Sequence, residues 1–369
     1  MKKFDKDRLI LGLAGPALAL VVAFALTSVV LLVSDRNPVE PYQLMWENAE
    51  YTDVQVLILN QAGTYYLAAL AVAIGFRMNL FNIGVDGQYR LAAMLAAVVG
   101  ASVELPGPLH ILLIVLVAMF VGAFWAGIAG ILKTTRGVSE VVSTIMLNAI
   151  ATSLIAWMIL PANLGVQPEG SNDLTTGEIS ESGWFPGVDV EGGVIYGFTF
   201  VAFALGIVYW FVLNRTRFGF DLRATGASES AAQASGVDAK KMVLTAMLIS
   251  GAVAGLSGLP LLLGQTHTYS LSFPVGVGFT GITIALLGRN NPVGIFFAAL
   301  LISFLEKTSA SLDQHGYEKE IATIMQGLIV ISVVVSYELV RQYGLRRQQQ
   351  KVGEELAAQA RKNKEVAAA

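Results

Sequence analysis

The sequence contains no cysteine, only three histidines and few charged residues for its length. Without cysteine, the chain can form neither a disulfide nor a thiolate metal site. The histidines, His110, His267 and His315, are too few for an imidazole-rich metal centre. Charged residues make up 14% of the chain, against about 25% in typical soluble proteins. No basic stripe with interleaved aromatic residues indicates a nucleic-acid partner.

The sequence also lacks the short motifs of common hydrolases and nucleotide-binding enzymes. The dipeptide Gly-Lys occurs nowhere among the 369 residues, so the phosphate-binding loop GxxxxGK[ST] is absent. HExxH and GxSxG are absent too, and no pair of aspartates lies on a predicted membrane helix. We therefore expect no catalytic residue, no metal, no cofactor and no enzymatic activity. The energy for any transport must come from a partner protein or an ion gradient.

Apolar residues are abundant: they make up 54% of the chain and give a mean hydropathy of +0.62. A helix of about 20 residues crosses the hydrocarbon of a bilayer. Ten apolar segments separated by Gly, Pro or charged residues predict an all-α, polytopic membrane protein, whose first segment is an uncleaved helix. They cover residues 9–33, 54–76, 88–104, 109–132, 138–160, 193–213, 242–264, 276–288, 293–305 and 320–340. The segments from 276 and from 293 are short, which indicates broken or re-entrant helices.

The distribution of Lys and Arg predicts the orientation of these helices, because basic residues collect on the cytoplasmic side. With ten crossings and both termini cytoplasmic, 21 of the 24 basic residues lie inside, including Arg77 and Arg90. The predicted extracytoplasmic loop over residues 161–192 contains six acidic and no basic residues. Residues 341–369 form a charged cytoplasmic tail without large apolar clusters.

One polar stretch interrupts the apolar sequence between residues 77 and 94. Gly84 and its neighbours permit a broken helix, and Asn82, Asp86 and Gln88 supply donors and acceptors that can replace the water around a polar solute. Two interpretations remain open: a gate in the translocation path, or a cytoplasmic turn whose arginines follow the charge rule. We favour the path, because polar groups at membrane depth are retained when they face protein or water.

A second set of polar residues lies at the start of the predicted helix over residues 138–160. The stretch from Arg136 to Ile150 begins with Ser139 as a predicted N-cap, and Glu140 falls in the first turn, where the helix dipole favours a carboxylate. Asn148 lies deeper. It either joins helices by hydrogen bonds or contacts the solute.

The largest predicted cytoplasmic loop covers residues 214–241. Its middle, from Thr225 to Gly236, is rich in small residues; Ser228 is a predicted helix start and Gly236 a predicted stop. A short helix there has a shape suited to a groove in another protein. The alternative is an ordinary solvated loop.

This loop resembles the ATPase-coupling segment of ABC importer permeases, and the resemblance is carried by Gly226, Ser230, Ala231, Ala232 and Gly236. Ser230 stands where many permeases have Glu, as in the ribose, branched-chain amino acid and nucleoside branch. The phrases FNIGVDGQ and GVSEVVSTIMLN resemble the larger permease of nucleoside importers.

The resemblance implies a single permease domain over residues 1–340 with the fold of the vitamin B12 importer permease. It implies that the chain works in a bacterial plasma membrane with a second, related permease, ATPase subunits and a substrate-binding lipoprotein. Nucleosides are the expected substrates; pentoses or branched-chain amino acids are the alternative. An ion-coupled secondary transporter is the alternative from a different class.

Overall fold

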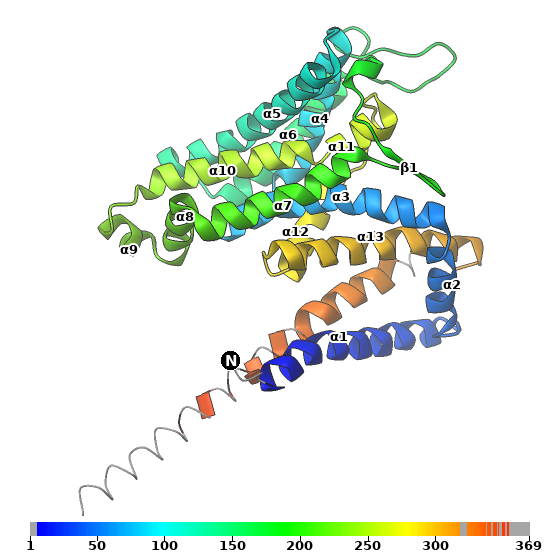
Figure 1. Cartoon of the computed structure of the whole chain (residues 1–369), viewed down its shortest axis with the longest axis vertical. Coiled ribbons are helices and arrows are strands. Elements are labelled where there is room, and N and C mark those ends of the chain that lie inside the picture. The colour runs from blue at the N-terminus through cyan, green and yellow to red at the C-terminus, as the bar shows by residue number, and fades with distance from the viewer. Residues whose placement is uncertain are drawn as a thin grey trace, which may run out of the picture. The chain divides into compact units, whose positions relative to one another are not determined.

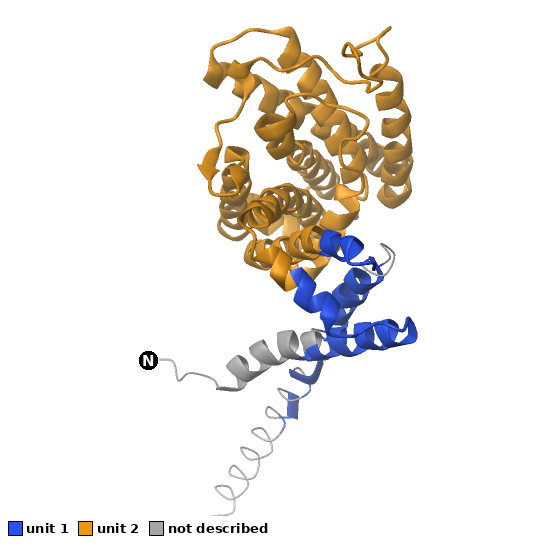
Figure 2. Cartoon of the chain, turned by 90° about the vertical axis from the view of Figure 1, so that its right-hand side faces the viewer, with its two compact units in different colours: residues 1–45, 309–369 blue, residues 46–308 orange. Residues whose placement is uncertain are grey.

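The computed structural model describes residues 6–317, 323–336, 338–340, 342–344, 346, 349–350 and 353. The chain divides into two compact units, which Figure 2 colours separately: residues 1–45 with 309–369, and residues 46–308. Most of the predicted tail over 341–369 lies outside the described residues. The single permease domain over residues 1–340 stays a prediction.

Helices make up most of the described chain (Figure 1). The first unit holds α1 (Lys6–Val33) and most of α2 (Glu40–Ala49). The long helices of the second unit are α3 (Thr52–Phe76), α4 (Val85–Ser102), α5 (Gly107–Arg136), α6 (Glu140–Met158), α7 (Gly197–Arg215), α10 (Ala239–Leu256) and α13 (Pro292–Gln314), whose end belongs to the first unit. The short helices are η1 (Glu181–Gly183), α8 (Arg217–Ala227), α9 (Glu229–Ala234), α11 (Leu259–Leu261), the π-helical turn η2 (Leu262–Thr266) and α12 (Val277–Leu287).

Seven helices of the described residues are long and apolar enough to cross a membrane, and Val21–Val33 and Val277–Leu287 are shorter apolar helices. Each of the ten predicted segments overlaps a helix, although the segment from 193 begins on a strand, Gly193–Ile195. The count of ten crossings stays a prediction. The segment from 276 is short, as predicted. The prediction of a short segment from 293 was wrong, because α13 continues through polar residues to Gln314.

The core of the second unit is built around α3, which is buried almost continuously from Ala62 to Gly75. Helices α7, α10 and α12 pack against it. Helices α8 and α9 lie at one end of this unit, and the segment between α6 and α7, residues 159–196, lies at the other (Figure 1). We call this segment the outer loop, after its predicted side of the membrane.

The outer loop departs from the all-α expectation by containing a two-stranded antiparallel hairpin, β1 (Val188–Val190) and β2 (Gly193–Ile195). Alternating valines form the strands, and Glu191 and Gly192 make the two-residue turn between them. Gly192 has a φ of 102°, which residues with a side chain rarely adopt. The short apolar alternation was hidden in the sequence by the acidic residues around it.

In the first unit, a polar contact joins two segments far apart in the sequence. Arg36 donates a 2.8 Å hydrogen bond to the carbonyl of Gly316 and lies over the ring of Tyr317. The Tyr317 hydroxyl donates to Glu40 at 2.8 Å. Burial, with the Glu40 carboxylate, raises the pKa of Tyr317 to about 12, so this hydroxyl remains a donor at neutral pH.

Helices α5 and α10 approach closely because small residues face each other along their contact. A Cβ at Gly122 would overlap the carbonyl oxygen of Gly251, and a Cβ at Gly255 would overlap that of Ala118. Small residues at four-residue spacing allow two helix backbones to pack this closely in a membrane. The α5–α10 pair therefore has little tolerance for added volume.

We predict that Gly255→Ala destabilises the protein by about 3 kcal/mol, because the added methyl group meets backbone that cannot rotate away. Gly327→Ala is the matched control, since a Cβ there meets no atom within 4 Å. Thermal unfolding of the purified protein in detergent measures both. Equal melting temperatures for the two variants would contradict the close packing.

Candidate functional site

The polar stretch after α3 lies inside the bundle from Asn82 onward, whereas Asn79 and Phe81 before it are exposed. Asn82 donates a 2.9 Å hydrogen bond to Ser250 of α10, and Ser250 donates at 2.7 Å to the carbonyl of Ala71. Ala71 lies five residues before the end of α3 at Phe76, which is about 7.5 Å at 1.5 Å per residue. The chain therefore turns back after α3, and α4 begins within the depth of the bundle.

Two of the predicted site residues, Asn82 and Gln88, bind each other through their amide groups. Asn82 donates to Gln88 at 3.0 Å, and Gln88 donates back at 2.9 Å. The Asn82 oxygen also accepts the backbone N–H of Gly84 at 3.1 Å. Both side chains are fully buried. Their hydrogen-bonding groups hold the first turn of α4, so they are not free to contact a solute directly.

Asn148, on α6, also binds backbone groups at the start of α4. Its oxygen accepts the backbone N–H of Gly87, and its nitrogen donates to the carbonyl of Ile83, both at 2.9 Å. It therefore joins two helices, the first of the two predicted roles, and it is only half-buried. The five residues predicted for the path, Asn82, Gly84, Asp86, Gln88 and Asn148, come together at one place.

A second helix also begins inside the bundle, beside Asp86. After η2, the chain runs back from the outer end without regular structure from His267 to Gly276, and then forms the short helix α12. The Asp86 carboxylate accepts the backbone N–H of Gly278, in the first turn of α12, at 3.2 Å. Tyr89 donates to the carbonyl of Pro274. One turn of α4 thus binds residues 267–276, which we call the re-entrant segment, and the start of α12.

Arg90 is a site residue that the sequence interpretation missed. It was counted among the basic residues of an inner loop, which is wrong: it lies within α4 and is only 7% exposed. It donates to Thr152 of α6 at 3.2 Å and interacts electrostatically with Asp86 and Tyr269. Among the described residues, the Nε of Arg90 is buried without a hydrogen-bond partner. The spacing of Asp86 and Arg90, one helical turn, was the available signal.

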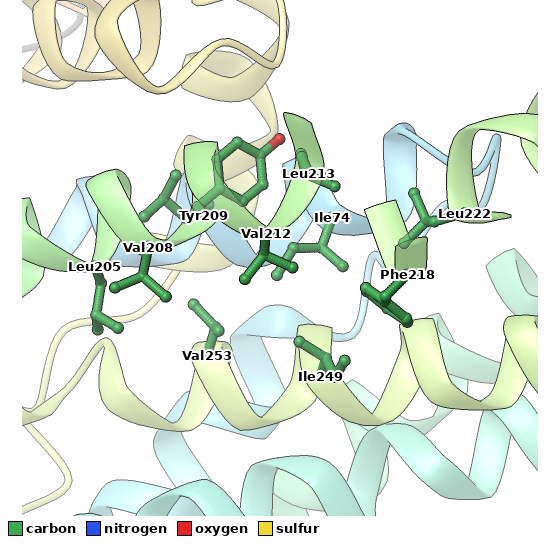
Figure 3. Close-up of a pocket in the computed structure, with 11 residues that line it drawn as sticks. Ile74, Leu205, Val208, Tyr209, Val212, Leu213, Phe218, Leu222, Ile249 and Val253 are labelled. Atoms are coloured by element: carbon green, nitrogen blue, oxygen red, sulfur yellow. The ribbon is translucent and has the colours of Figure 1, made fainter. Parts of the chain in front are cut away.

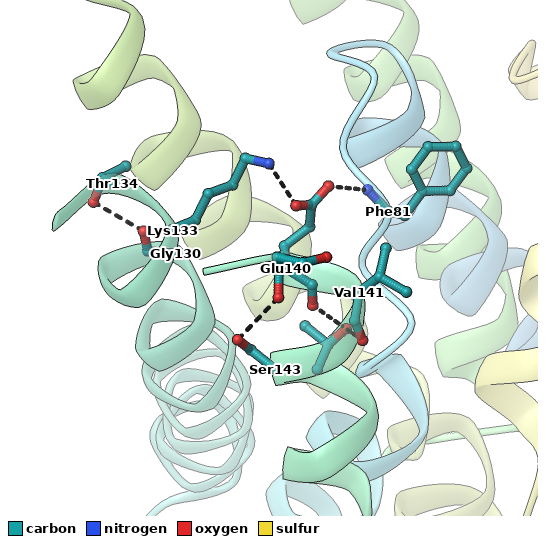
Figure 4. Close-up of polar contacts among 9 residues, drawn as sticks. Phe81, Gly130, Lys133, Thr134, Glu140, Val141 and Ser143 are labelled. Atoms are coloured by element: carbon teal, nitrogen blue, oxygen red, sulfur yellow. Dashed lines mark hydrogen bonds and ion pairs between the residues drawn. The ribbon is translucent and has the colours of Figure 1, made fainter. Parts of the chain in front are cut away.

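Glu140 connects three inner segments (Figure 4). Its carboxylate lies 2.5 Å from the Lys133 ammonium at the end of α5 and accepts the backbone N–H of Phe81 at 3.3 Å. Ser139 occupies the predicted N-cap position, but its side chain makes no capping hydrogen bond. Glu140 therefore joins α5, α6 and the turn before α4. This role adds to the predicted interaction of its carboxylate with the helix dipole.

The predicted helix start at Ser228 is confirmed: its hydroxyl accepts the N–H of Ala231 at 3.3 Å and caps α9. Gly236 follows the end of α9 with a φ of 84°, as predicted. Residues 225–227, which were included in the predicted coupling helix, belong instead to the preceding helix α8. The two helices are separated because Ser228 has extended backbone angles, with a φ of −160° and a ψ of 111°.

Exposure separates the five predicted coupling residues. Ser230, Ala231 and Gly236 are exposed, whereas Ala232 is buried, with only 3% of its surface exposed. Gly226 is packed: a Cβ there would lie 2.7 Å from the carbonyl oxygen of Arg77. Helix α8 therefore contacts the turn that leads to Asn82 directly.

Arg77 extends this contact to the end of α12. Its guanidinium donates to the carbonyl of Asn290 at 2.7 Å, and the Tyr209 hydroxyl of α7 donates to the same carbonyl at 3.0 Å. Through these contacts, a movement of α8 would displace the turn before α4 and the segment that follows α12.

The outer loop is fastened to the start of the re-entrant segment. Thr176 and Tyr269 exchange two 2.9 Å hydrogen bonds, and Ile179 donates to the carbonyl of His267 at 2.9 Å. Trp184 stacks on His267 with 3.9 Å between the ring centroids. Burial lowers the pKa of His267, against the opposing effect of the Glu178 carboxylate. The neutral imidazole is therefore the form that packs.

The arrangement brings hydrogen-bonding groups and aromatic rings together inside the bundle. Among the described residues, no cluster of three or more potential ligands that could hold a metal ion occurs.

Comparison with known proteins places these features in context. Residues 55–334 match the family described as the permease component of branched-chain amino acid transport systems. The chain is 34% identical over 337 residues to the guanosine ABC transporter permease protein NupP of Bacillus subtilis, covering 88% of this chain and 93% of that protein. It is 30% identical over 331 residues to the nucleoside ABC transporter permease protein NupB of Lactococcus lactis, covering 87% and 90%. It is 29% identical over 336 residues to the glucose ABC transporter permease protein TsgB13 of Haloferax volcanii, covering 87% of each chain.

We predict that acid loosens the outer loop. The folded pKa of His267 is lowered, so below about pH 6.5 the opened loop binds a proton that the packed loop excludes, and stability falls as pH drops towards the folded pKa. Hydrogen exchange of the Ile179 amide, corrected for intrinsic rate, should show less protection at about pH 5.5 than at about pH 7.5. His267→Asn, which tolerates the φ of 52°, should abolish the difference; persistence of the difference in this variant would exclude His267.

We also predict that Asn82 and Gln88 stabilise α4 as a pair. Gln88→Met leaves the buried Asn82 amide without its partner and should cost about 2 kcal/mol. Adding Asn82→Leu should cost less than the sum of the single changes, with a coupling of about 1 kcal/mol. Denaturant titration of the four proteins measures this cycle, and strictly additive losses would show that the pair is not coupled.

Proposed function

The chain belongs to the permease family of branched-chain amino acid transport systems, and we propose that it forms the translocation path of an ATP-driven importer for nucleosides. The similarity to guanosine and nucleoside permeases over nearly the whole chain supports this substrate. The chain is a transport subunit and not an enzyme. Its partners are ATPase subunits, a second and related permease, and a substrate-binding lipoprotein. It resides in a bacterial plasma membrane with both termini cytoplasmic.

The observation that carries this proposal is the irregular backbone between His267 and Gly276. Unpaired backbone groups are costly in hydrocarbon, so non-helical backbone at membrane depth faces protein or a water-filled path. Val275 is 68% exposed and Phe279, in the first turn of α12, is 52% exposed. Because lipid is a poor neighbour for this segment, its exposed side is best explained as the path, bordered opposite by the second permease.

Aromatic and charged side chains pack behind this segment. Tyr89, Tyr269 and Phe273 form a buried aromatic group, with 4.9 Å between the ring centroids of Tyr269 and Phe273. Arg90, which is 7% exposed, lies beside this group. Asp86 and Asn148 border the path in this account, and Asn82, Gly84 and Gln88 support it from behind.

Helices α8 and α9 transmit the ATPase cycle in this account. The exposed face of α9, with Ser230 and Ala231, is presented to an ATPase subunit. Because Gly226 packs on the turn at Arg77, displacement of α8 shifts that turn, and Arg77 carries the shift to Asn290 after α12. A rigid helix seated in a cleft cannot move without moving the segments that it contacts.

A sugar importer is the second candidate, because a glucose permease is 29% identical over most of the chain. Branched-chain amino acids are a weaker alternative that follows from the family description. The identities of 34% and 30% to guanosine and nucleoside permeases favour a nucleoside over a sugar.

Uptake of labelled guanosine tests the proposal in cells that express the transporter with and without this chain. We expect uptake that requires this chain, stops on ATP depletion, survives collapse of the proton gradient and is blocked by excess adenosine. Blocking by glucose, ribose or leucine instead would overturn the substrate. Loss of uptake with the proton gradient alone would overturn the ATP-driven mechanism.

We predict that Gly226→Leu reduces uptake at least about tenfold, because the new side chain separates α8 from the turn at Arg77. ATP hydrolysis should continue but should no longer respond to substrate. Ala227→Leu, at the adjacent exposed position of the same helix, is the matched control and should transport normally. Equal uptake by both variants would show that this contact does not transmit the ATPase cycle.

A further inference from the structure

An apolar cavity of about 110 Å³ lies between two membrane helices of the second unit (Figure 3). Val208 and Val212 of α7 face Ile249 and Val253 of α10 across it, and Phe218 and Leu222 of α8 close its inner end. The one polar side chain in its wall, Tyr209, directs its hydroxyl away to the carbonyl of Asn290. The cavity thus presents hydrocarbon on all sides.

Water is not a stable occupant of such a cavity. A buried water needs two to four polar partners, and an engineered apolar cavity of about 150 Å³ stays dry and takes up benzene. The mouth is open, since Val208 is 53% and Ile249 is 37% exposed. Both residues belong to membrane-spanning helices, so the hydrocarbon available at the mouth is a lipid chain.

Positive charge gathers at the inner end of the same cavity. Arg215 and Arg217 flank the start of α8, next to Phe218, and both are exposed. Arg217 is 92% exposed and has only a 3.7 Å contact with Asp221. A pair this exposed is weak, so the guanidinium remains available to a phosphate. Arg223 is occupied, because it donates to the carbonyl of Leu213.

We propose that this cavity binds an anionic phospholipid of the cytoplasmic leaflet. One acyl chain enters between α7 and α10, and the phosphate lies against Arg215 and Arg217. Apolar burial and charge act together here, as stable lipid attachment generally requires more than one signal. The lipid holds α8 and therefore sets the position from which α8 and α9 meet the ATPase. This assignment rests on the proposed function in one respect: the proposed function places α8 on the cytoplasmic side of the membrane.

Photocrosslinking of the complete transporter in lipid nanodiscs tests the proposal. The probe is phosphatidylglycerol with a photoreactive group in its acyl chain, and labelled peptides are mapped by mass spectrometry. We expect labels within residues 205–222 and 249–253, displaced by unlabelled phosphatidylglycerol and not by phosphatidylcholine. Val253→Phe fills the cavity and Arg217→Gln removes the charge; each should reduce labelling at least about threefold.

Two matched variants control for general effects. Ile207→Phe adds the same side chain at a 70% exposed position of α7, and Arg136→Gln removes an exposed charge at the end of α5. Both should leave labelling unchanged. Labels elsewhere, equal displacement by phosphatidylcholine, or a crosslink to another protein subunit at this site would each overturn the proposal.

Labelling requires no transport, so its result is independent of guanosine uptake measured on the same preparations. A transporter that labels as predicted but carries another substrate refutes the nucleoside assignment and leaves the lipid site. One that imports guanosine without labelling in this cavity refutes the lipid site alone. The unmutated protein and the two competing lipids keep the test decisive even if a variant fails to fold.

Discussion

Backbone hydrogen bonding inside the membrane is the constraint on which the rest of this structure depends. Two helices, α4 and α12, begin within the bundle, where their first N–H groups cannot reach bulk water. Side chains supply the missing acceptors: Asn82 for Gly84, Asn148 for Gly87 and Asp86 for Gly278. The polar residues of the interrupted stretch are therefore required by the fold itself, whether or not a solute is bound, and in our proposal the path lies beside them.

The same bonds connect the two ends of the second unit. At the inner end, α8 contacts the turn at Arg77, and Arg77 binds Asn290 after α12. At the outer end, Thr176 and Trp184 hold the segment that leads into α12. A displacement at α8 and a displacement of the outer loop thus act on the same short helix. In the proposed transport cycle, these contacts would let both displacements act through α12.

Much of this arrangement was predictable from the sequence, because apolar length and polar interruption are local signals. They predicted the positions of the helices, the gathering of Asn82, Asp86 and Asn148, and the end of the coupling segment at Gly236. Other features depend on contacts between distant residues. The burial of Arg90 depends on α6, and the extension of α13 to Gln314 depends on polar residues that hydropathy treats as a stop.

The burial of Ala232 belongs to the same class, because it follows from how α8 and α9 pack. Similarly, the acidic composition of the outer loop carried no sign of the strands or of the stacking on His267. Composition does not predict local structure that depends on contacts between residues distant in the sequence.

The most direct test of the central claim is the access of water to the re-entrant segment. Because the chain has no cysteine, single cysteines at Val275, Phe279 and Ile207 can be labelled without background in the assembled transporter. All three positions are more than half exposed. Our account predicts that a membrane-impermeant maleimide modifies positions 275 and 279 to an extent that changes through the ATPase cycle, and leaves position 207 unmodified. Equal protection of all three positions would contradict a water-filled path along this segment.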